Sequence, residues 1–380
     1  PEVIISDEKG KEQLAAVGVG LEEKVIGPEI LLPTTGTDLS EEQRSRLEQI
    51  QEQWKETDAL YGIFTSGSTG TPKAIVVSHG AVSRFIRHFT EIFEITSADV
   101  IGNQAPFDFD VSVKDIYSSI MTGAQLVLIP KEYFSTPPRL LDYLCDKKVT
   151  NLTWAVSALT LVSALKGLNY RVPESVKRVM FSGEAMPPKQ LRIWQEKLPD
   201  AKFVNLYGPT EITCNCTYFP IERQYEDSEK IPAGKAFPGR RVILVDEEGK
   251  QVTEPGVQGE ICSAGESLAN GYYKEPEQTA EKFVLYPVDG TEQRMYRTGD
   301  LGSYDEEGNI IFAGRKDFQI KHMGHRIELE EIERSMTALE GVEKSCCIFD
   351  TEKNRIMGFF LGEKTASEVR KQMKEKLPVY

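Results

Sequence analysis

The sequence predicts an α/β protein with a mostly parallel, layered sheet that carries helices on both faces. Up to about residue 230, short apolar strands alternate with amphipathic helices, as in a parallel sheet that is buried on both sides. Between about 231 and 316, short strands separated by Gly, Pro and Asp-Glu-Glu-Gly turns indicate a small β-barrel subdomain. Residues 1–316 are therefore expected to form one large subdomain. Helix signals then return, so residues 317–380 are expected to begin a small C-terminal α+β subdomain.

The expected elements follow in order along the chain. Residues 37–57 are predicted to form a surface helix, because Ser40 and Gln43 have the spacing of a capping box. Strand-like runs at 60–65 and 74–79 then flank a loop rich in hydroxyl groups. Further helices are expected at 80–93, 111–123, 138–148, 157–167 and 187–199, and further strands at 125–130, 151–156, 176–183 and 201–208.

The composition excludes several kinds of partner. A formal net charge of -14 is unsuited to nucleic acid or to an anionic membrane, since both attract positive surfaces. No apolar stretch approaches the roughly 20 residues of a membrane helix, and the N-terminus has no signal-peptide pattern. The six cysteines form no Cys-x-x-Cys pair and only four histidines are present, so we expect no zinc site and a cytoplasmic location. The chain does not begin with methionine and is expected to be a fragment or an excised module.

The segment TSGSTGTPK, residues 65–73, is the first candidate for chemistry. It differs from a Walker A loop, because Gly67 and Gly70 are too close together and Lys73 follows a proline. It also differs from a dinucleotide fingerprint, because a strand follows it rather than a helix. A hairpin turn is one interpretation, since these residue types favour turns. The other is a phosphate loop, in which amides and hydroxyls wrap a polyphosphate and Lys73 neutralises its charge.

Three further motifs follow the loop in order: NLYGPTE at 205–211, YRTGDL at 296–301 and GRKDFQIKHMGHRIELEEIE at 314–333. Together with TSGSTGTPK they resemble the ANL superfamily of adenylate-forming enzymes. Within it they resemble the amino-acid adenylation domains of nonribosomal peptide synthetases and the closely similar D-alanine–carrier protein ligases. The resemblance runs from about residue 58 to the C-terminus, and it favours the phosphate loop over a plain turn. It also implies that Asp317 is the hinge between the two subdomains.

The resemblance implies a reaction in two steps. An amino acid is activated by ATP as aminoacyl-AMP, with release of pyrophosphate. The aminoacyl group then passes to the phosphopantetheine thiol of a carrier protein during nonribosomal peptide synthesis. ATP and Mg²⁺ would be the cofactors, and neighbouring synthetase domains would be partners. The alternatives are a D-alanine–carrier protein ligase and, in another class, an inactive fragment that only binds nucleotide or a carrier protein.

The resemblance also assigns the residues around the nucleotide. Lys73, Thr210 and Glu211 would be catalytic, with Thr210 on the α-phosphate and Glu211 holding Mg²⁺. The β- and γ-phosphates would be gripped by Thr65, Ser66, Gly67, Ser68, Thr69, Gly70 and Lys73. The adenine would be framed by Gly183, Glu184, Asn205 and Tyr207. Asp300 would accept both ribose hydroxyls, because its two oxygens can each take one donor, and Arg315 would reach the ribose or a phosphate.

The amino-acid pocket is expected around Asp110, which matches the family aspartate that pairs with an α-ammonium group. A helix cap is the alternative role of Asp110. Lys114 either pairs with Asp110 four residues earlier or faces an acidic substrate side chain as a buried ammonium. The other predicted pocket residues are Val111, Trp154, Met180, Ser182, Leu206, Cys214 and Asn215. Asp110 disfavours acyl-CoA synthetase and luciferase-like functions, and a small-to-medium polar or acidic amino acid, such as Asp or Glu, is expected.

The chain departs from the family pattern at both ends. The N-terminal stretch that normally precedes residue 1 is missing, and so is the C-terminal segment whose lysine bridges the carboxylate and the α-phosphate. We therefore expect this chain to bind ATP weakly and to adenylate poorly. Lys114 and Trp154 are unlike a pocket shaped for alanine, which favours a peptide-synthetase module over the ligase.

Overall fold

In a computed structural model the chain divides into two compact units, Pro1–Trp54 and Lys55–Tyr380. The structure describes residues 4–17, 21, 24–27, 40–65, 72–316, 319–322, 325–350, 353 and 355–377. The first unit contains the short parallel strands β1 (Ile4–Ile5) and β2 (Val25–Ile26) and the helices α1 (Glu8–Val17) and α2 (Glu41–Gln53). Ser40 caps α2 and exchanges hydrogen bonds with Gln43, so the predicted capping box is confirmed.

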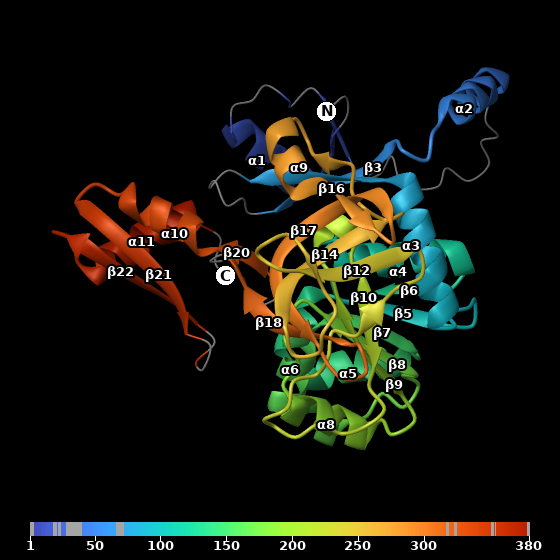
Figure 1. Ribbon diagram of the computed structural model, residues 1–380. Helices are drawn as coiled ribbons and strands as arrows, with labels where there is room; N and C mark the ends of the chain where they lie inside the picture. The colour runs from blue at the N-terminus through green and yellow to red at the C-terminus, as the bar shows by residue number, and fades with distance from the viewer. Residues whose placement is uncertain are drawn as a thin grey trace. The chain divides into compact units, whose positions relative to one another are not determined.

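The second unit is built on a seven-stranded sheet with the order β11-β10-β9-β8-β7-β5-β6 (Figure 1). Its parallel strands are β5 (Val100–Asn103), β6 (Gln125–Leu128), β7 (Asn151–Ala155), β8 (Arg178–Ser182) and β9 (Lys202–Tyr207). The antiparallel strands β10 (Thr217–Pro220) and β11 (Lys235–Ala236) extend one edge. This mostly parallel arrangement confirms the fold class that the alternating pattern predicts.

Helices cover both faces of this sheet, because successive side chains of a strand point to opposite sides. On β8, Met180 belongs to a buried cluster that contains side chains of α3 (His79–Ile92) and α4 (Val111–Thr122). Its neighbours Val179 and Phe181 belong to a second cluster on the other face. The helices that contribute to the second cluster are α5 (Pro137–Asp146), α6 (Val156–Ala164), α7 (Gly167–Tyr170) and α8 (Pro188–Lys197), and the 3-10 turn Lys131–Ser135 packs beside them.

The strands around the TSGSTGTPK segment form a separate antiparallel sheet, which differs from the sequence prediction. β3 (Ala59–Thr65) pairs with β4 (Lys73–Ser78), and β15 (Gly271–Tyr272) pairs with the other edge of β4. Thr65 lies opposite Lys73. The connection is therefore a hairpin, since it is far shorter than the dozen or so residues that a parallel crossover needs. The strand predicted at 74–79 is thus present as β4, but it belongs to this antiparallel sheet and not to the parallel one. Residues 66–71 of the TSGSTGTPK segment lie outside the described residues.

The remaining strands of the second unit are antiparallel. A curled sheet contains β12 (Arg240–Val245), β13 (Gln251–Val252), β14 (Gln258–Gly265), β16 (Phe283–Val288), β17 (Thr291–Tyr304) and β18 (Ile310–Arg315), with α9 (Pro276–Lys282) before β16. It corresponds to the barrel that the sequence predicts. The C-terminal elements are β19 (Gln319–His322), β20 (His325–Glu328), α10 (Leu329–Thr337), β21 (Val342–Asp350), β22 (Arg355–Gly362) and α11 (Ala366–Lys376). The predicted hinge residue Asp317 lies outside the described residues.

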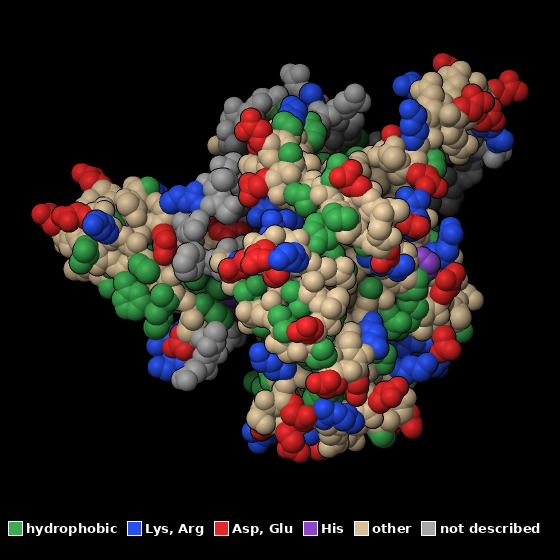
Figure 2. Space-filling model, in the orientation of Figure 1, with side chains coloured by type: hydrophobic (Ala, Val, Ile, Leu, Met, Phe, Trp, Pro, Cys, Tyr) green, Lys and Arg blue, Asp and Glu red, His purple; other side chains and the backbone are tan. Residues whose placement is uncertain are grey.

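The surface of the chain is mixed in charge. On the face drawn in Figure 2, acidic and basic side chains are interspersed. Within the described part of the chain, no helix is long and apolar enough to cross a membrane. No group of three or more His, Cys, Asp and Glu side chains that could hold a metal ion occurs there either.

Candidate active site

A large cavity opens at the carboxyl ends of β5, β8 and β9, where the segments that follow these strands form its wall. Ligands of open α/β sheets bind at this edge, because loops from neighbouring strands meet there. The hairpin strand β3, residues of the curled sheet and residues of the C-terminal elements from β19 to α11 complete the wall. The predicted site residues that line the cavity are Thr65, Asp110, Val111, Ser182, Gly183, Thr210, Cys214, Asp300 and Arg315.

The phosphate end of the predicted site contains a buried ion pair. The Lys73 Nζ lies 3.9 Å from Oε1 of Glu211, and Glu211 is fully buried. The Lys73 ammonium also lies 4.2 Å from the centre of the Tyr272 ring, and the Tyr272 hydroxyl donates a hydrogen bond of 3.1 Å to Glu211 Oε1. These contacts offset the cost of removing two charges from water. The structure therefore brings together the predicted phosphate lysine and the predicted metal carboxylate.

Other predicted phosphate ligands are less completely described. Thr65 lies at the end of β3, and its buried hydroxyl has no hydrogen-bond partner within the described part of the chain. Thr210 begins a 3-10 turn (Thr210–Ile212) directly after β9. Ser66, Gly67, Ser68, Thr69 and Gly70 lie outside the described residues.

Asp300 stands at the centre of a buried hydrogen-bond network. Its Oδ2 accepts a bond of 2.6 Å from the Tyr207 hydroxyl, and its Oδ1 accepts one from Arg315 Nη1. Asp300 and Arg315 lie opposite each other on the paired strands β17 and β18, so their contact follows from the register. Burial, and to a lesser extent the charge of Asp300, raises the pKa of Tyr207 well above its ordinary value, so Tyr207 remains a neutral donor. Each carboxylate oxygen retains the capacity to accept a second bond, which suits a pair of hydroxyls.

The other residues predicted to frame an adenine differ in their positions. Gly183 lines the cavity with a φ of +98°, a conformation that side chains with a Cβ rarely adopt. Glu184 is half-buried and is not part of the cavity wall. The Asn205 amide donates a 2.7 Å hydrogen bond to the Pro232 carbonyl and supports the loop that leads to the curled sheet.

Asp110 lies at the start of α4, on the cavity wall. Its side chain makes no capping hydrogen bond to the helix, which contradicts the alternative role as a helix cap. The Cys214 thiol donates a 3.0 Å hydrogen bond to the backbone carbonyl of Asp110. Burial is the main cause that raises the pKa of this thiol, so Cys214 stays a protonated donor.

The segment after β9 has an unusual backbone that places Cys214 against Asp110. Thr213 and Cys214 both have positive φ angles, 57° and 64°, which are uncommon for residues other than glycine. The Thr213 hydroxyl donates a 2.7 Å hydrogen bond to the Ser267 carbonyl and holds this turn. A Cβ at Gly208 would lie 2.6 Å from the Cα of Asn215, so only glycine allows the two ends of the segment to approach this closely.

Lys114 and Asn215 form a fully buried pair behind the cavity wall. The Lys114 Nζ donates a 2.6 Å hydrogen bond to Asn215 Oδ1. Burial lowers the pKa of Lys114, while the nearby Cys214, Asp110 and Asp115 act against this shift. Burial also raises the pKa of Asp115 to about 7, although its carboxylate accepts a 3.0 Å hydrogen bond from Asn103.

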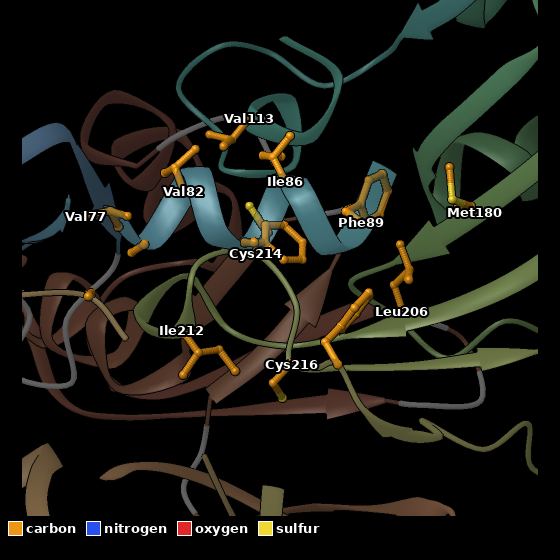
Figure 3. Packing of buried hydrophobic residues seen from close by; sticks show 14 of the residues in the cluster. Val77, Val82, Ile86, Phe89, Val113, Met180, Leu206, Ile212, Cys214 and Cys216 are labelled. Atoms are coloured by element: carbon orange, nitrogen blue, oxygen red, sulfur yellow. The ribbon is translucent and has the colours of Figure 1, made fainter. Parts of the chain in front are cut away.

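Three predicted pocket residues lie in hydrophobic clusters rather than on the cavity wall. Met180 and Leu206 pack in the cluster that contains Cys214 and the apolar face of α3 (Figure 3). Trp154 belongs to the cluster on the opposite face of the sheet, and its indole donates a 2.8 Å hydrogen bond to the Gly102 carbonyl. Contact of these three side chains with a substrate remains a prediction.

Two tyrosines at the site were not predicted. Tyr272 enters through the pairing of β15 with β4, and no motif marks it. Tyr61 lines the cavity from β3, inside the predicted strand 60–65 but outside the loop motif. The spacing of Tyr61 and Thr65 along one strand is the signal that could have identified Tyr61, because residues four apart in a strand share a face.

Comparisons with known proteins identify the family of this chain. The family model described as "AMP-binding enzyme" matches residues 1–273. Tyrocidine synthase 3 of Brevibacillus parabrevis is 37% identical over 330 residues, which are 85% of this chain and 5% of that protein. A D-alanine--D-alanyl carrier protein ligase of Bacillus cytotoxicus is 34% identical over 339 residues, which are 86% of this chain and 66% of the ligase. The chain thus spans less than two thirds of each of these relatives.

Solved structures give the same fold. The crystal structure of IdnL1 matches with a TM-score of 0.74 and 31% identity, over 86% of this chain and 66% of the other. The Vibrio cholerae adenylation domain AlmE, solved with glycyl-adenosine-5'-phosphate, matches with a TM-score of 0.83 over 100% of this chain and 74% of its own. At 24% identity the match with AlmE supports the fold alone.

Proposed function

Because the chain belongs to the family of AMP-binding enzymes, we propose that it is an adenylating ligase that activates an amino acid with ATP. The products of the first step are aminoacyl-AMP and pyrophosphate. The aminoacyl group then passes to the phosphopantetheine thiol of a carrier protein in the cytoplasm. The observation that carries the proposal is that one cavity is lined by two carboxylates, Asp300 for a ribose and Asp110 for an ammonium group.

Asp300 is proposed to bind the ribose of ATP. Tyr207 and Arg315 each occupy one bond to its carboxylate and fix the orientation of both oxygens. The remaining lone pairs then accept the two adjacent hydroxyls of the sugar. Held in this way, the nucleoside would direct its phosphates towards Thr210, which lines the same cavity, and this is a contribution of positioning.

Lys73 and Glu211 are proposed to handle the charge of the phosphates. Glu211 is a suitable ligand for magnesium, because this ion usually takes one or two protein carboxylates and completes its shell with phosphates and water. When bound, magnesium would offset negative charge on the phosphate oxygens. Lys73 would neutralise the departing pyrophosphate as the substrate carboxylate attacks the α-phosphorus and the bond to the β-phosphate breaks.

The amino acid is proposed to lie against Asp110 on the cavity wall, with the Lys114–Asn215 pair behind that wall. Asp110 would pair with the α-ammonium group, an interaction worth about 1.5–3 kcal/mol for a hydrogen bond to a charged group. Behind it, Lys114 offers a buried positive charge and Asn215 a polar amide. A polar or acidic side chain satisfies these groups, whereas an apolar one leaves them desolvated.

Two other functions remain candidates. The D-alanine–carrier protein ligase is supported by the 34% identity to such an enzyme. The buried ammonium of Lys114 speaks against it, because the methyl side chain of alanine does not need a charged partner. The second candidate is an inactive protein that only binds nucleotide or a carrier protein. It differs from an adenylating enzyme in forming no aminoacyl-AMP. As part of the proposal, neighbouring synthetase domains would be partners, since the peptide-synthetase relatives are many times longer than this chain.

The direct test is amino-acid-dependent exchange of labelled pyrophosphate into ATP, run with each of the common amino acids. Exchange with serine, aspartate, glutamate or their amides is the expected result, at a slow but measurable rate because this chain is expected to adenylate poorly. Exchange with alanine alone would support the ligase. Exchange with only aliphatic or aromatic amino acids would contradict the proposed substrate class, and no exchange at all would contradict the adenylation reaction.

A further inference from the structure

Tyr61 is a cavity residue that the proposed reaction does not yet use. It lies on β3 opposite Val77 of β4, and its side chain is on the same strand face as Ile63 and Thr65. All three line the cavity. Tyr61 therefore belongs to the part of the cavity wall that β3 supplies.

The hydroxyl of Tyr61 is buried and has no hydrogen-bond partner in the part of the chain that the structure describes. Buried polar groups are nearly always hydrogen-bonded, and each exception calls for a ligand, a water or a strained role. Burial, with a smaller contribution from the charge of Asp110, raises the pKa of Tyr61 well above its ordinary value. The group is therefore a neutral phenol, with one proton to donate and lone pairs to accept.

The surroundings of this hydroxyl indicate the kind of ligand. Tyr61 and Asp110 line the same cavity, and the charge of Asp110 contributes to the raised pKa of Tyr61. The Cys214 thiol is already engaged with the backbone carbonyl of Asp110. The unpartnered oxygen of Tyr61 and the carboxylate of Asp110 thus belong to one cavity wall, a combination that suits a cationic ligand.

An α-ammonium group has three N–H donors, and the carboxylate of Asp110 does not have to satisfy all of them. We propose that the phenol oxygen of Tyr61 accepts a hydrogen bond from the α-ammonium group of the amino acid bound by Asp110. This contact rests on the proposed function. It gives the cavity a second means of distinguishing an amino acid from the corresponding carboxylic acid.

The test measures binding by calorimetry in the full chain and in Tyr61→Phe. The probes are the non-hydrolysable 5′-O-sulfamoyladenosine adducts of serine and aspartate, each beside the counterpart with hydrogen in place of the α-amino group. Tyr61→Phe is expected to bind the aminoacyl probes roughly 10- to 100-fold more weakly, the range for a hydrogen bond to a charged group. It is expected to bind the deaminated probes unchanged. Tyr286→Phe, which removes a hydroxyl bonded to the Gly249 carbonyl, is the matched control and should bind all probes like the wild type.

Thermal unfolding separates this role from a structural one. Removing an unpartnered buried hydroxyl is expected to leave the melting temperature of Tyr61→Phe equal to or above that of the wild type. Equal affinity of Tyr61→Phe for the aminoacyl probes, or an equal loss for both kinds of probe, would overturn the contact and leave the proposed function standing. A wild-type protein that binds none of the probes would overturn the proposed function, and the contact with it.

Discussion

The Nζ of Lys73 lies 3.9 Å from Oε1 of Glu211, with the Tyr272 ring beside the ammonium and the Tyr272 hydroxyl bonded to the same carboxylate oxygen. Lys73 begins β4, whereas Glu211 follows β9 of the parallel sheet. The groups proposed to hold the phosphates and the magnesium therefore stabilise each other across two sheets. This pairing links the stability of the fold to the chemistry of the site.

The first prediction concerns this ion pair. Lys73→Met is expected to lower the free energy of unfolding by about 3 kcal/mol, because Glu211 keeps a buried charge without this cation. Lys73→Met with Glu211→Gln should recover most of that loss, while pyrophosphate exchange stays at least about 100-fold reduced in both variants. Urea unfolding and exchange assays measure the two effects, with Lys250→Met at an exposed position as control. A double variant as unstable as Lys73→Met would contradict the coupling.

The second prediction concerns the ribose contact. Asp300→Asn is expected to raise the KM for ATP roughly 10- to 100-fold, because one acceptor and the charge facing Arg315 are lost. The KM for the amino acid should change little. Asp305→Asn, in the turn between β17 and β18, serves as the control and should leave both values unchanged. A nucleotide-binding protein without turnover would instead show no exchange in any variant.

The third prediction concerns substrate choice. Lys114→Met nearly keeps the length of the side chain but removes the buried ammonium, which donates a hydrogen bond to Asn215. The ratio of exchange with aspartate or glutamate to exchange with leucine or methionine should fall at least about tenfold. The exposed Lys131→Met is the control. An unchanged profile over the common amino acids would mean that Lys114 does not select the side chain.

The fourth prediction concerns pH. The pKa of the buried Asp115 is raised from 3.8 to about 7 in the folded protein. This carboxyl therefore contributes stability that is fully present below pH 3.8 and is lost as the pH rises to about 7. Asp115→Asn should gain stability relative to the wild type by about 1.4 kcal/mol per pH unit within this window. Urea unfolding at pH 5, 6 and 7 measures the difference, and parallel curves for the two proteins would refute the assignment.

Local patterns predicted the parts of the fold that depend on neighbouring residues. The capping box at Ser40 and the end of α4 at Gly123, with a φ of +76°, follow from local backbone chemistry. The strand that pairs with β4 cannot be predicted from local backbone chemistry. Whether a strand joins the parallel sheet or a hairpin depends on the length of its connection and on distant strands such as β15.

The candidate site shows the same division. Motifs identified Asp300, Arg315 and Asp110, but the Lys114–Asn215 bond joins residues 101 positions apart, and no motif marks it as a pair. Trp154 is separated from Met180 because its register partner is Phe181, which places it on the other face of the sheet. A register is a property of two paired strands, so the sequence of one strand does not show it.

The close approach of Gly208 to Asn215 has a consequence for retargeting the protein to another amino acid. Residues 208–215 contain both Thr210, which is proposed to contact the phosphates, and Cys214, which is proposed to line the amino-acid pocket; both line the cavity. A bulkier side chain grafted at one end would shift the other, and a gain in selectivity would then be accompanied by a slower reaction. Pocket variants are therefore best built by replacing residues 208–215 together with the corresponding segment of a related enzyme.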